Sequence, residues 1–201
     1  MMVHDLDADR KLIGELQREG HQAFQVIFDR YWKELYQTSY NRLRDQTAAE
    51  DLVQDVFADL WQKRQDIYLE TSLRSYLYGS VKYRIIRIFN RGSLHQHAVA
   101  HLLSRMSEME DAVADVLEYK DLERSISQTI NSFPENMRNI FLLRSEEFTI
   151  REIASALGLA EQSVKNNVTD GLKRLKVVLL KTDPDIKRSL YLLLVALIAE
   201  K

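Results

Sequence analysis

The sequence predicts an all-α protein made of two small helical domains joined by a flexible linker. Only six glycines and two prolines interrupt the 201 residues, and apolar residues recur mostly at helical spacing. A helix-turn-helix pattern near the carboxyl end marks the second domain. We expect a first domain over residues 1–92, a linker with partial helix over residues 93–117, a second domain over residues 118–183, and an apolar helix over residues 184–201.

Three helices are expected before the first loop. One covers residues 7–19 and ends at Gly20, and a longer one continues to Leu43. Thr47 and Glu50 have the spacing of a capping box that would begin the third, over residues 49–61. One side of this third helix is apolar, and the other is formed by Glu50, Asp51, Gln54, Asp55 and Asp59. Taken alone, such an acidic stripe is usually a solvated face.

The fourth expected helix, over residues 73–91, combines aromatic and basic residues. It contains no acidic residue, and its cations are Arg74, Lys82, Arg84, Arg87 and Arg91. Tyr83 lies between two of them, with Tyr68 and Tyr78 nearby. Cations that contact phosphates and rings that stack on bases are typical of proteins that bind unpaired DNA. Aromatic residues at helical spacing are also common in protein cores, so this segment alone is ambiguous.

The helix-turn-helix pattern covers residues 148–176. Thr149 and Glu152 form a capping box, and Gly158 ends the first helix because the residue after a helix often has a left-handed backbone. An apolar stripe from Val164 to Leu175 predicts the second helix. Its outward side chains suit base edges and phosphates in the major groove. A solvated helix pair in a bundle is the alternative.

Composition limits the other classes of function. The chain has no cysteine, which excludes disulfides and thiolate metal sites. His95, His97 and His101 are close in sequence, but we interpret them as loop histidines and predict no metal or cofactor. The longest apolar run, over residues 190–199, is about half of a membrane span, so we expect no membrane insertion and a cytoplasmic protein.

The charge distribution suggests two kinds of partner. The net charge is only −2, yet residues 50–59 and 108–118 are acidic without a base, and residues 71–92 are basic without an acid. Such segregation indicates separate surfaces for DNA and for a basic protein. No phosphate-binding loop or nucleophile motif is visible, so we predict no catalytic residue and no enzymatic activity. A hydrolase or transferase with an accessory DNA-binding domain is the weakest alternative.

Three motifs together resemble those of the extracytoplasmic-function (ECF) sigma factors, the promoter-recognising subunits of bacterial RNA polymerase. They are AEDLVQDVFADLW at residues 49–61, SLRSYLY at residues 72–78 before the basic helix, and FPENMRNIFLL at residues 133–143 before the helix-turn-helix. The resemblance implies binding to core RNA polymerase and to double-stranded and melted promoter DNA. It also implies an anti-sigma factor as a partner. The main alternative is a stand-alone helix-turn-helix transcriptional regulator.

The resemblance implies three sets of site residues. The core-binding set is Glu50, Asp51, Gln54, Asp55 and Asp59. The minus-ten set is Tyr68, Leu73, Arg74, Lys82, Tyr83, Arg84, Arg87 and Arg91. The minus-thirty-five set is Gln162, Ser163, Lys165, Asn166, Asn167, Lys173 and Arg174.

Five positions depart from the family pattern. Tyr83 replaces a common asparagine, Arg87 a common aspartate, and Asn167 a frequent histidine. Ala160 replaces the usual serine or threonine cap of the recognition helix, and Glu147 occupies a turn position that is commonly glycine. The promoter sequence therefore cannot be copied from relatives.

The segment after Pro184 is apolar on all sides. An all-round apolar helix has to be buried. Packing against the second domain is the simpler expectation, and binding to the first domain or to an anti-sigma factor is the alternative.

Overall fold

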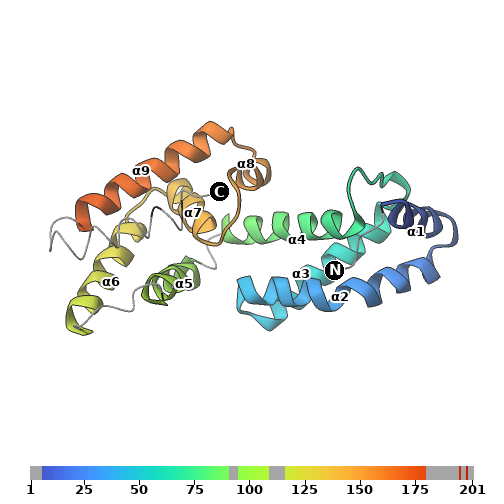
Figure 1. Cartoon of the computed structure of the whole chain (residues 1–201), viewed down its shortest axis with the longest axis horizontal. Coiled ribbons are helices and arrows are strands. Elements are labelled where there is room, and N and C mark those ends of the chain that lie inside the picture. Colours follow the sequence, from blue (N-terminus) through green and yellow to red (C-terminus); the bar gives the residue numbers. More distant parts are fainter. Residues whose placement is uncertain (1–5, 91–94, 109–115, 180–194, 196–197, 199–201) are drawn as a thin grey trace. The chain divides into compact units, whose positions relative to one another are not determined.

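The computed structural model describes residues 6–90, 95–108, 116–179, 195 and 198, and these residues form helices without a β-strand (Figure 1). This confirms the all-α fold class. The chain divides into two compact units, Met1–Ile85 and Ile86–Lys201, and the division falls inside one helix. The domain boundaries predicted near residues 92 and 118 stay a prediction.

Unit 1 is built from consecutive helices and one short turn of 3₁₀ helix. Its elements are α1 (Leu6–Glu19), α2 (His21–Leu43), α3 (Gln46–Gln62), η1 (Arg64–Asp66) and the larger part of α4 (Leu73–Asn90). α2 packs on both α1 and α3. The fully buried side chains include Leu16, Ile27, Leu35, Leu60 and Leu77, one or more from each α-helix, so every helix contributes to a single core.

Local signals explain where these helices end. Gly20 has φ of 62°, which glycine adopts without steric cost, and it separates α1 from α2. Asp45 begins α3, because its side chain accepts a hydrogen bond from the Ala48 amide. The capping box predicted from Thr47 and Glu50 is therefore wrong. A carboxylate two residues earlier already satisfies the first turn, and Thr47 lies inside the helix.

Unit 2 is arranged around α7 (Glu135–Ser145), which packs against α5 (His95–Glu108), α8 (Ile150–Leu157) and α9 (Glu161–Leu179). α6 (Val116–Asn131) packs on α9. α5 lies inside the residues predicted as linker, and its Ala98, Val99 and Leu102 are buried. Its contact with α7 makes α5 part of the core of unit 2. The fully buried Ile140, Phe141, Leu142 and Leu143 show why α7 is central.

Gly171 sets how closely α9 approaches α7. A Cβ atom at this position would lie 2.7 Å from Cδ2 of Phe141 and 3.2 Å from Cε2 of Phe133. We expect Gly171→Ala to destabilise unit 2 by about 1–2 kcal/mol, because overpacking exceeds the gain in helix propensity. Gly14→Ala in α1 is the matched control, since its nearest atom is 4.0 Å away, and it should stabilise slightly. Urea unfolding of both variants checks this; equal effects would contradict it.

Candidate nucleic-acid interface

α8 and α9 form the helix-turn-helix that the sequence predicts. The Thr149 amide donates to Oε2 of Glu152 at 2.8 Å, and the Glu152 amide donates to Oγ1 of Thr149 at 3.2 Å. This confirms the capping box. Gly158 ends α8 with φ of 67°, as expected for a left-handed position. Glu147, which stands where the family commonly has glycine, has φ of 64°, a left-handed backbone that is uncommon for a residue with a side chain.

The inward and outward sides of α9 separate clearly. Val164, Val168, Leu172 and Leu175 are buried, as predicted. Six members of the minus-thirty-five set are exposed: Gln162, Ser163, Lys165, Asn166, Lys173 and Arg174. The seventh, Asn167, is half-buried.

Three amide side chains of α9 are held by hydrogen bonds within the helix. Nε2 of Gln162 donates to Oδ1 of Asn166 at 3.0 Å, and Nδ2 of Asn167 donates to the carbonyl of Ser163 at 2.8 Å. Asn167 therefore faces back along its own helix, whereas the Gln162–Asn166 pair points into solvent. Lys173 lies 3.4 Å from Asp170 in an exposed ion pair, which contributes little to stability. The outer face of α9 combines ordered amides with cations that solvent reaches.

The acidic side of α3 is only partly a free surface. Asp51, Gln54 and Asp55 are exposed. Glu50 is half-buried, and its Oε1 accepts a hydrogen bond from Gln46 at 2.9 Å. The exposed part of this face therefore consists of two carboxylates and one amide, close together on consecutive turns.

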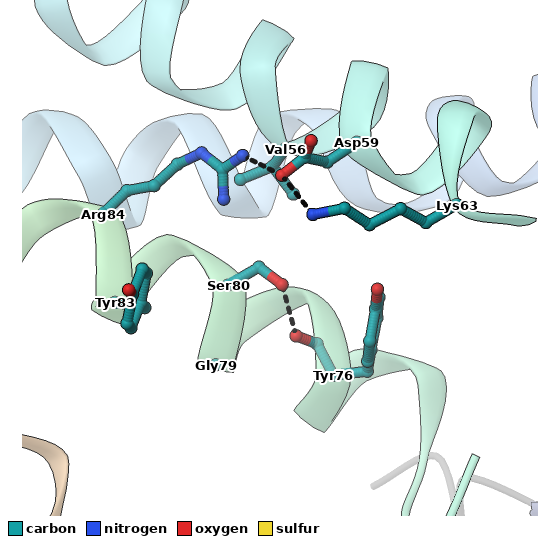
Figure 2. Close-up of a pocket in the computed structure, with 8 residues that line it drawn as sticks. All are labelled: Val56, Asp59, Lys63, Tyr76, Gly79, Ser80, Tyr83 and Arg84. Carbon is teal, nitrogen blue, oxygen red and sulfur yellow. Dashed lines mark hydrogen bonds and ion pairs between the residues drawn. The ribbon is translucent and has the colours of Figure 1, made fainter. Parts of the chain in front are cut away.

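Asp59 differs from the rest of the core-binding set because its carboxylate forms ion pairs with two cations of this chain. Its Oδ2 accepts from Arg84 of α4, and Lys63 lies 3.4 Å from the same oxygen (Figure 2). The hydrogen bond from Arg84 holds the pKa of the Asp59 carboxyl below its ordinary value. Arg84 also donates to the carbonyl of Asp55 at 3.3 Å. The structure thus brings together one residue from the core-binding set and one from the minus-ten set.

A pocket of about 340 Å³ lies between α3 and α4 beside this ion pair (Figure 2). Its lining residues are Val56, Asp59, Lys63, Tyr76, Gly79, Ser80, Tyr83 and Arg84. Tyr83 is 44 % exposed, while Tyr76 is half-buried at the other end of the pocket. Two rings and two cations around one hollow have the chemistry of a nucleotide site, in which rings stack on a base and cations contact phosphate.

The remaining minus-ten residues fall into different environments. Tyr68 is 76 % exposed, and Arg87 is exposed on α4. Nε of Arg74 donates to Oε2 of Glu34 at 3.3 Å, and its guanidinium lies over the ring of Tyr78. Lys82 is half-buried. Arg91 lies outside the described residues.

Leu73 requires a correction. Its side chain is 0 % exposed, so it belongs to the core of unit 1, and we remove it from the side chains that could touch DNA. The sequence placed it at the start of the basic helix, where exposure could not be judged. Its backbone is still informative, because the Leu73 amide donates to a carboxylate of α1.

Sequence reasoning missed the residues that hold the minus-ten set in place. Glu34 of α2 accepts hydrogen bonds from Arg74 and from the hydroxyl of Tyr78. Asp9 of α1 bonds to Leu73, the first residue of α4, and Arg10 and Gln17 bond to the segment before it. No local pattern could have found them, because each contact joins residues at least 40 positions apart.

Among the described side chains of unit 2, His101 makes a polar contact with Glu146. Nδ1 of His101 lies 2.5 Å from Oε1 of Glu146, which ties α5 to the turn after α7. His95, His97 and His101 lie on α5, so their interpretation as loop histidines is wrong. The side chains of His95 and His97 lie outside the described part of the chain, and the absence of a metal stays a prediction. Within the described residues no cluster of three metal-binding side chains occurs. No described helix is both long enough and apolar enough to cross a membrane.

Comparison with known families decides what these surfaces belong to. The family model "Sigma-70 region 2" matches residues 27–95, and "Sigma-70, region 4" matches residues 123–175. The two matches cover the acidic and cationic helices of unit 1 and the helix-turn-helix of unit 2. The chain belongs to the sigma-70 family.

Relatives of this sigma factor are of the ECF type. The chain is 24 % identical over 160 residues to the ECF RNA polymerase sigma factor SigX of Bacillus subtilis (strain 168), covering 77 % of this chain and 82 % of SigX. It is 23 % identical over 180 residues to SigW of the same organism, covering 83 % of this chain and 94 % of SigW. Together with the family matches, these relatives identify an ECF sigma factor.

A solved structure, CnrH in complex with the cytosolic domain of CnrY, also aligns with this sigma factor. It is 21 % identical, covers 88 % of this chain and 99 % of that chain, and has a TM-score of 0.42.

Proposed function

We propose that this ECF sigma factor binds core RNA polymerase, places it on a promoter and opens the DNA there. One observation supports this best. An exposed acidic face on α3 and a pocket with two cations and two tyrosines lie in the same unit, and the other unit carries a helix-turn-helix. The chemistry of RNA synthesis would belong to polymerase, so no catalytic residue is assigned to this chain.

The acidic face of α3 is the proposed contact with core polymerase. Asp51 and Asp55 are exposed carboxylates with Gln54 between them, suited to a basic partner surface. Glu50 lies at the edge of this face. Asp59 is better explained by its bonds to Arg84 and Lys63, so its charge is mostly satisfied within the protein.

The loop before α4 and the outer side of α4 are the proposed contact with the minus-ten element. Opening a duplex removes pairing and stacking, so the protein must offer replacement contacts to the exposed bases. Tyr83 and Tyr76 beside Lys63 and Arg84 could hold one unpaired nucleotide in the pocket. Tyr68, with its exposed ring, could stack on another.

The outer face of α9 is the proposed contact with the minus-thirty-five element. Gln162, Lys165 and Asn166 lie in its first turns, the part of a recognition helix that meets base edges in the major groove. Lys173 and Arg174 lie farther along and would contact phosphates.

A transcription experiment tests the proposed function. The purified chain is added to core polymerase free of sigma factors, with a library of promoter fragments as template. We expect transcripts from a subset of templates and none without the chain. A stand-alone regulator is not favoured by the match to sigma region 2, and it would give no transcript in this assay.

Asn166→Ala should selectively reduce promoter discrimination. A side chain that bonds to a base edge contributes about 1–3 kcal/mol to the preference for that base, whereas a phosphate contact weakens all sequences equally. Lys173→Ala is the matched control, and it should lower affinity uniformly. Affinities of each variant for duplexes that carry single base-pair changes in the minus-thirty-five element measure the affinity and the discrimination. If Asn166→Ala lowers the affinity for all duplexes equally, Asn166 contacts the DNA phosphate backbone and not a base.

The remaining partner is an anti-sigma factor. By analogy with the family, we propose that this sigma factor is cytoplasmic and that an anti-sigma factor binds it and keeps it from core polymerase. Pull-down from the source cells with the tagged full chain, with and without added core polymerase, tests this. A bound protein that core polymerase displaces would support the proposal, and capture of polymerase alone would contradict it.

A further inference from the structure

α1 is bonded along its length to the segment that leads into α4. Ile13 and Leu16 of α1 are buried, as are Ile67 and Leu69 in that segment, and α1 packs against η1 at its beginning. Polar side chains of α1 then bond to the segment's backbone at several points. This helix lies before the family match, which begins at residue 27, so its role is not given by the family model.

The first point of attachment is the start of α4. Oδ2 of Asp9 accepts a hydrogen bond from the amide of Leu73 at 2.8 Å. Leu73 is the first residue of α4, and Asp9 is only 3 % exposed. A carboxylate at a helix amino terminus satisfies a free amide and interacts favourably with the helix dipole. Asp9 therefore satisfies the first amide of α4, while Oγ of Ser72 accepts from the Ser75 amide at 3.2 Å.

The second point of attachment is the peptide beside Tyr68. Nε and Nη2 of Arg10 both donate to the carbonyl of Leu69, at 3.2 and 3.1 Å. The same guanidinium lies 5.6 Å from the centre of the Tyr68 ring. Tyr68 remains 76 % exposed. Arg10 thus holds the backbone and supports one side of the ring, while the rest of the ring faces solvent.

The third point of attachment is the short helix η1 and the residue after it. Nε2 of Gln17 donates to the carbonyls of Arg64 and Ile67, at 3.0 and 3.2 Å. Gln65 returns a bond to the carbonyl of Gln17 at 3.0 Å. The segment between α3 and α4 is therefore held at its beginning, its middle and its end by one helix.

We propose that α1 positions this segment for binding to the unpaired strand of the minus-ten element, with Asp9 and Arg10 as the positioning residues. The inference rests on the proposed function. A segment already ordered in the free protein loses less conformational freedom when DNA binds, so its contacts contribute more to affinity. Arg10 acts through Tyr68 and the Leu69 peptide, and it need not touch DNA itself.

The experiment measures binding of a fluorescent single-stranded oligonucleotide, carrying the minus-ten sequence, to polymerase assembled with the full chain. We expect Arg10→Ala to weaken binding about fivefold to tenfold, because the substitution removes a pair of charge-assisted hydrogen bonds that order the segment. Lys11→Ala is the matched control, because Lys11 is a neighbouring cation with a side chain 78 % exposed, and it should bind normally. Equal loss in both variants would overturn the proposal.

A double-mutant cycle separates positioning from a general structural effect. If Arg10 acts partly through Tyr68, the Arg10→Ala and Tyr68→Ala double variant should lose less affinity than the sum of the two single losses. Fully additive losses would overturn the proposal. Asp9→Asn keeps an oxygen that can accept from Leu73, so it should bind better than Asp9→Ala. Equal binding of these two would count against Asp9.

Failure of this inference differs from failure of the proposed function. If the unmodified chain directs no promoter-specific transcript, the proposed function is wrong. If it does, and Arg10→Ala opens promoters normally by permanganate footprinting, only the role of α1 is wrong. Melting temperatures of all variants are measured alongside, and Arg10→Lys, which keeps the cation, should give an intermediate affinity even if Arg10→Ala folds poorly.

Discussion

Asp55→Arg should weaken binding to core RNA polymerase by about tenfold or more, which is about 1.4 kcal/mol or more. Asp55 lies at the centre of the exposed acidic face of α3, and reversing its charge replaces attraction with repulsion toward a basic partner. Promoter preference should not change, because Asp55 belongs to neither set of residues proposed to contact DNA. Fluorescence anisotropy of the labelled full chain against core polymerase measures the affinity.

Asp29→Arg is the matched control for this change. Asp29 is exposed on α2 of the same unit, and its carboxylate accepts a hydrogen bond only from the neighbouring Gln25 in the described contacts. The substitution alters net charge by the same amount. If both variants lose equal affinity, the effect is one of overall charge. Altered promoter preference with normal core affinity in the Asp55 variant would reject the docking assignment.

Arg144→Met should destabilise unit 2 by about 2–4 kcal/mol, because it leaves two buried carbonyl oxygens without a donor. Arg144 is 2 % exposed at the end of α7. Its Nη1 donates to the carbonyl of Phe148 at 2.5 Å, and its Nε donates to the carbonyl of Ile198 at 3.0 Å. Burial lowers the pKa of this guanidinium from its ordinary value, because an apolar surrounding disfavours the charged form.

Hydrogen exchange at the amides of α7 and α8 measures this destabilisation within unit 2 alone. Arg151→Met, at an exposed position of α8, is the control and should leave exchange unchanged. Equal protection in both variants would show that the carbonyls find other donors. The bond to Ile198, which is itself 0 % exposed, also supports the expectation that part of the apolar tail packs on the second domain.

The helices could be predicted because their signals are local. Gly158 and the pair Thr149 and Glu152 specify the limits of α8 within ten residues, and apolar spacing specifies the buried side of α9. The error at Thr47 shows the limit of such signals. Two residues near one helix start can both have the side chain of a cap. Asp45 is the cap because its backbone is extended, as a capping residue requires, whereas Thr47 is already helical.

The candidate sites could be predicted only as stretches of chain. Which residue faces which neighbour depends on the rotation of whole helices, and that is decided by the core. Asp59 and Arg84 are 25 positions apart, and Asp9 and Leu73 are 64 apart. Neither pair has a spacing that a sequence pattern would reveal. Leu73 was misjudged because its side chain is 0 % exposed at a helix start, and no local pattern shows that burial.

The ion pair between Asp59 and Arg84 reduces the net positive charge that α4 presents to DNA. Binding to DNA is favoured partly because phosphates replace small ions that had gathered around basic side chains. Arg84 already has a carboxylate beside it, and so does Arg74, through Glu34. Each therefore has fewer small ions to release than an arginine surrounded only by water. In the proposed complex, these two arginines would contribute shape and hydrogen-bond direction to the binding of an opened strand more than they would contribute charge.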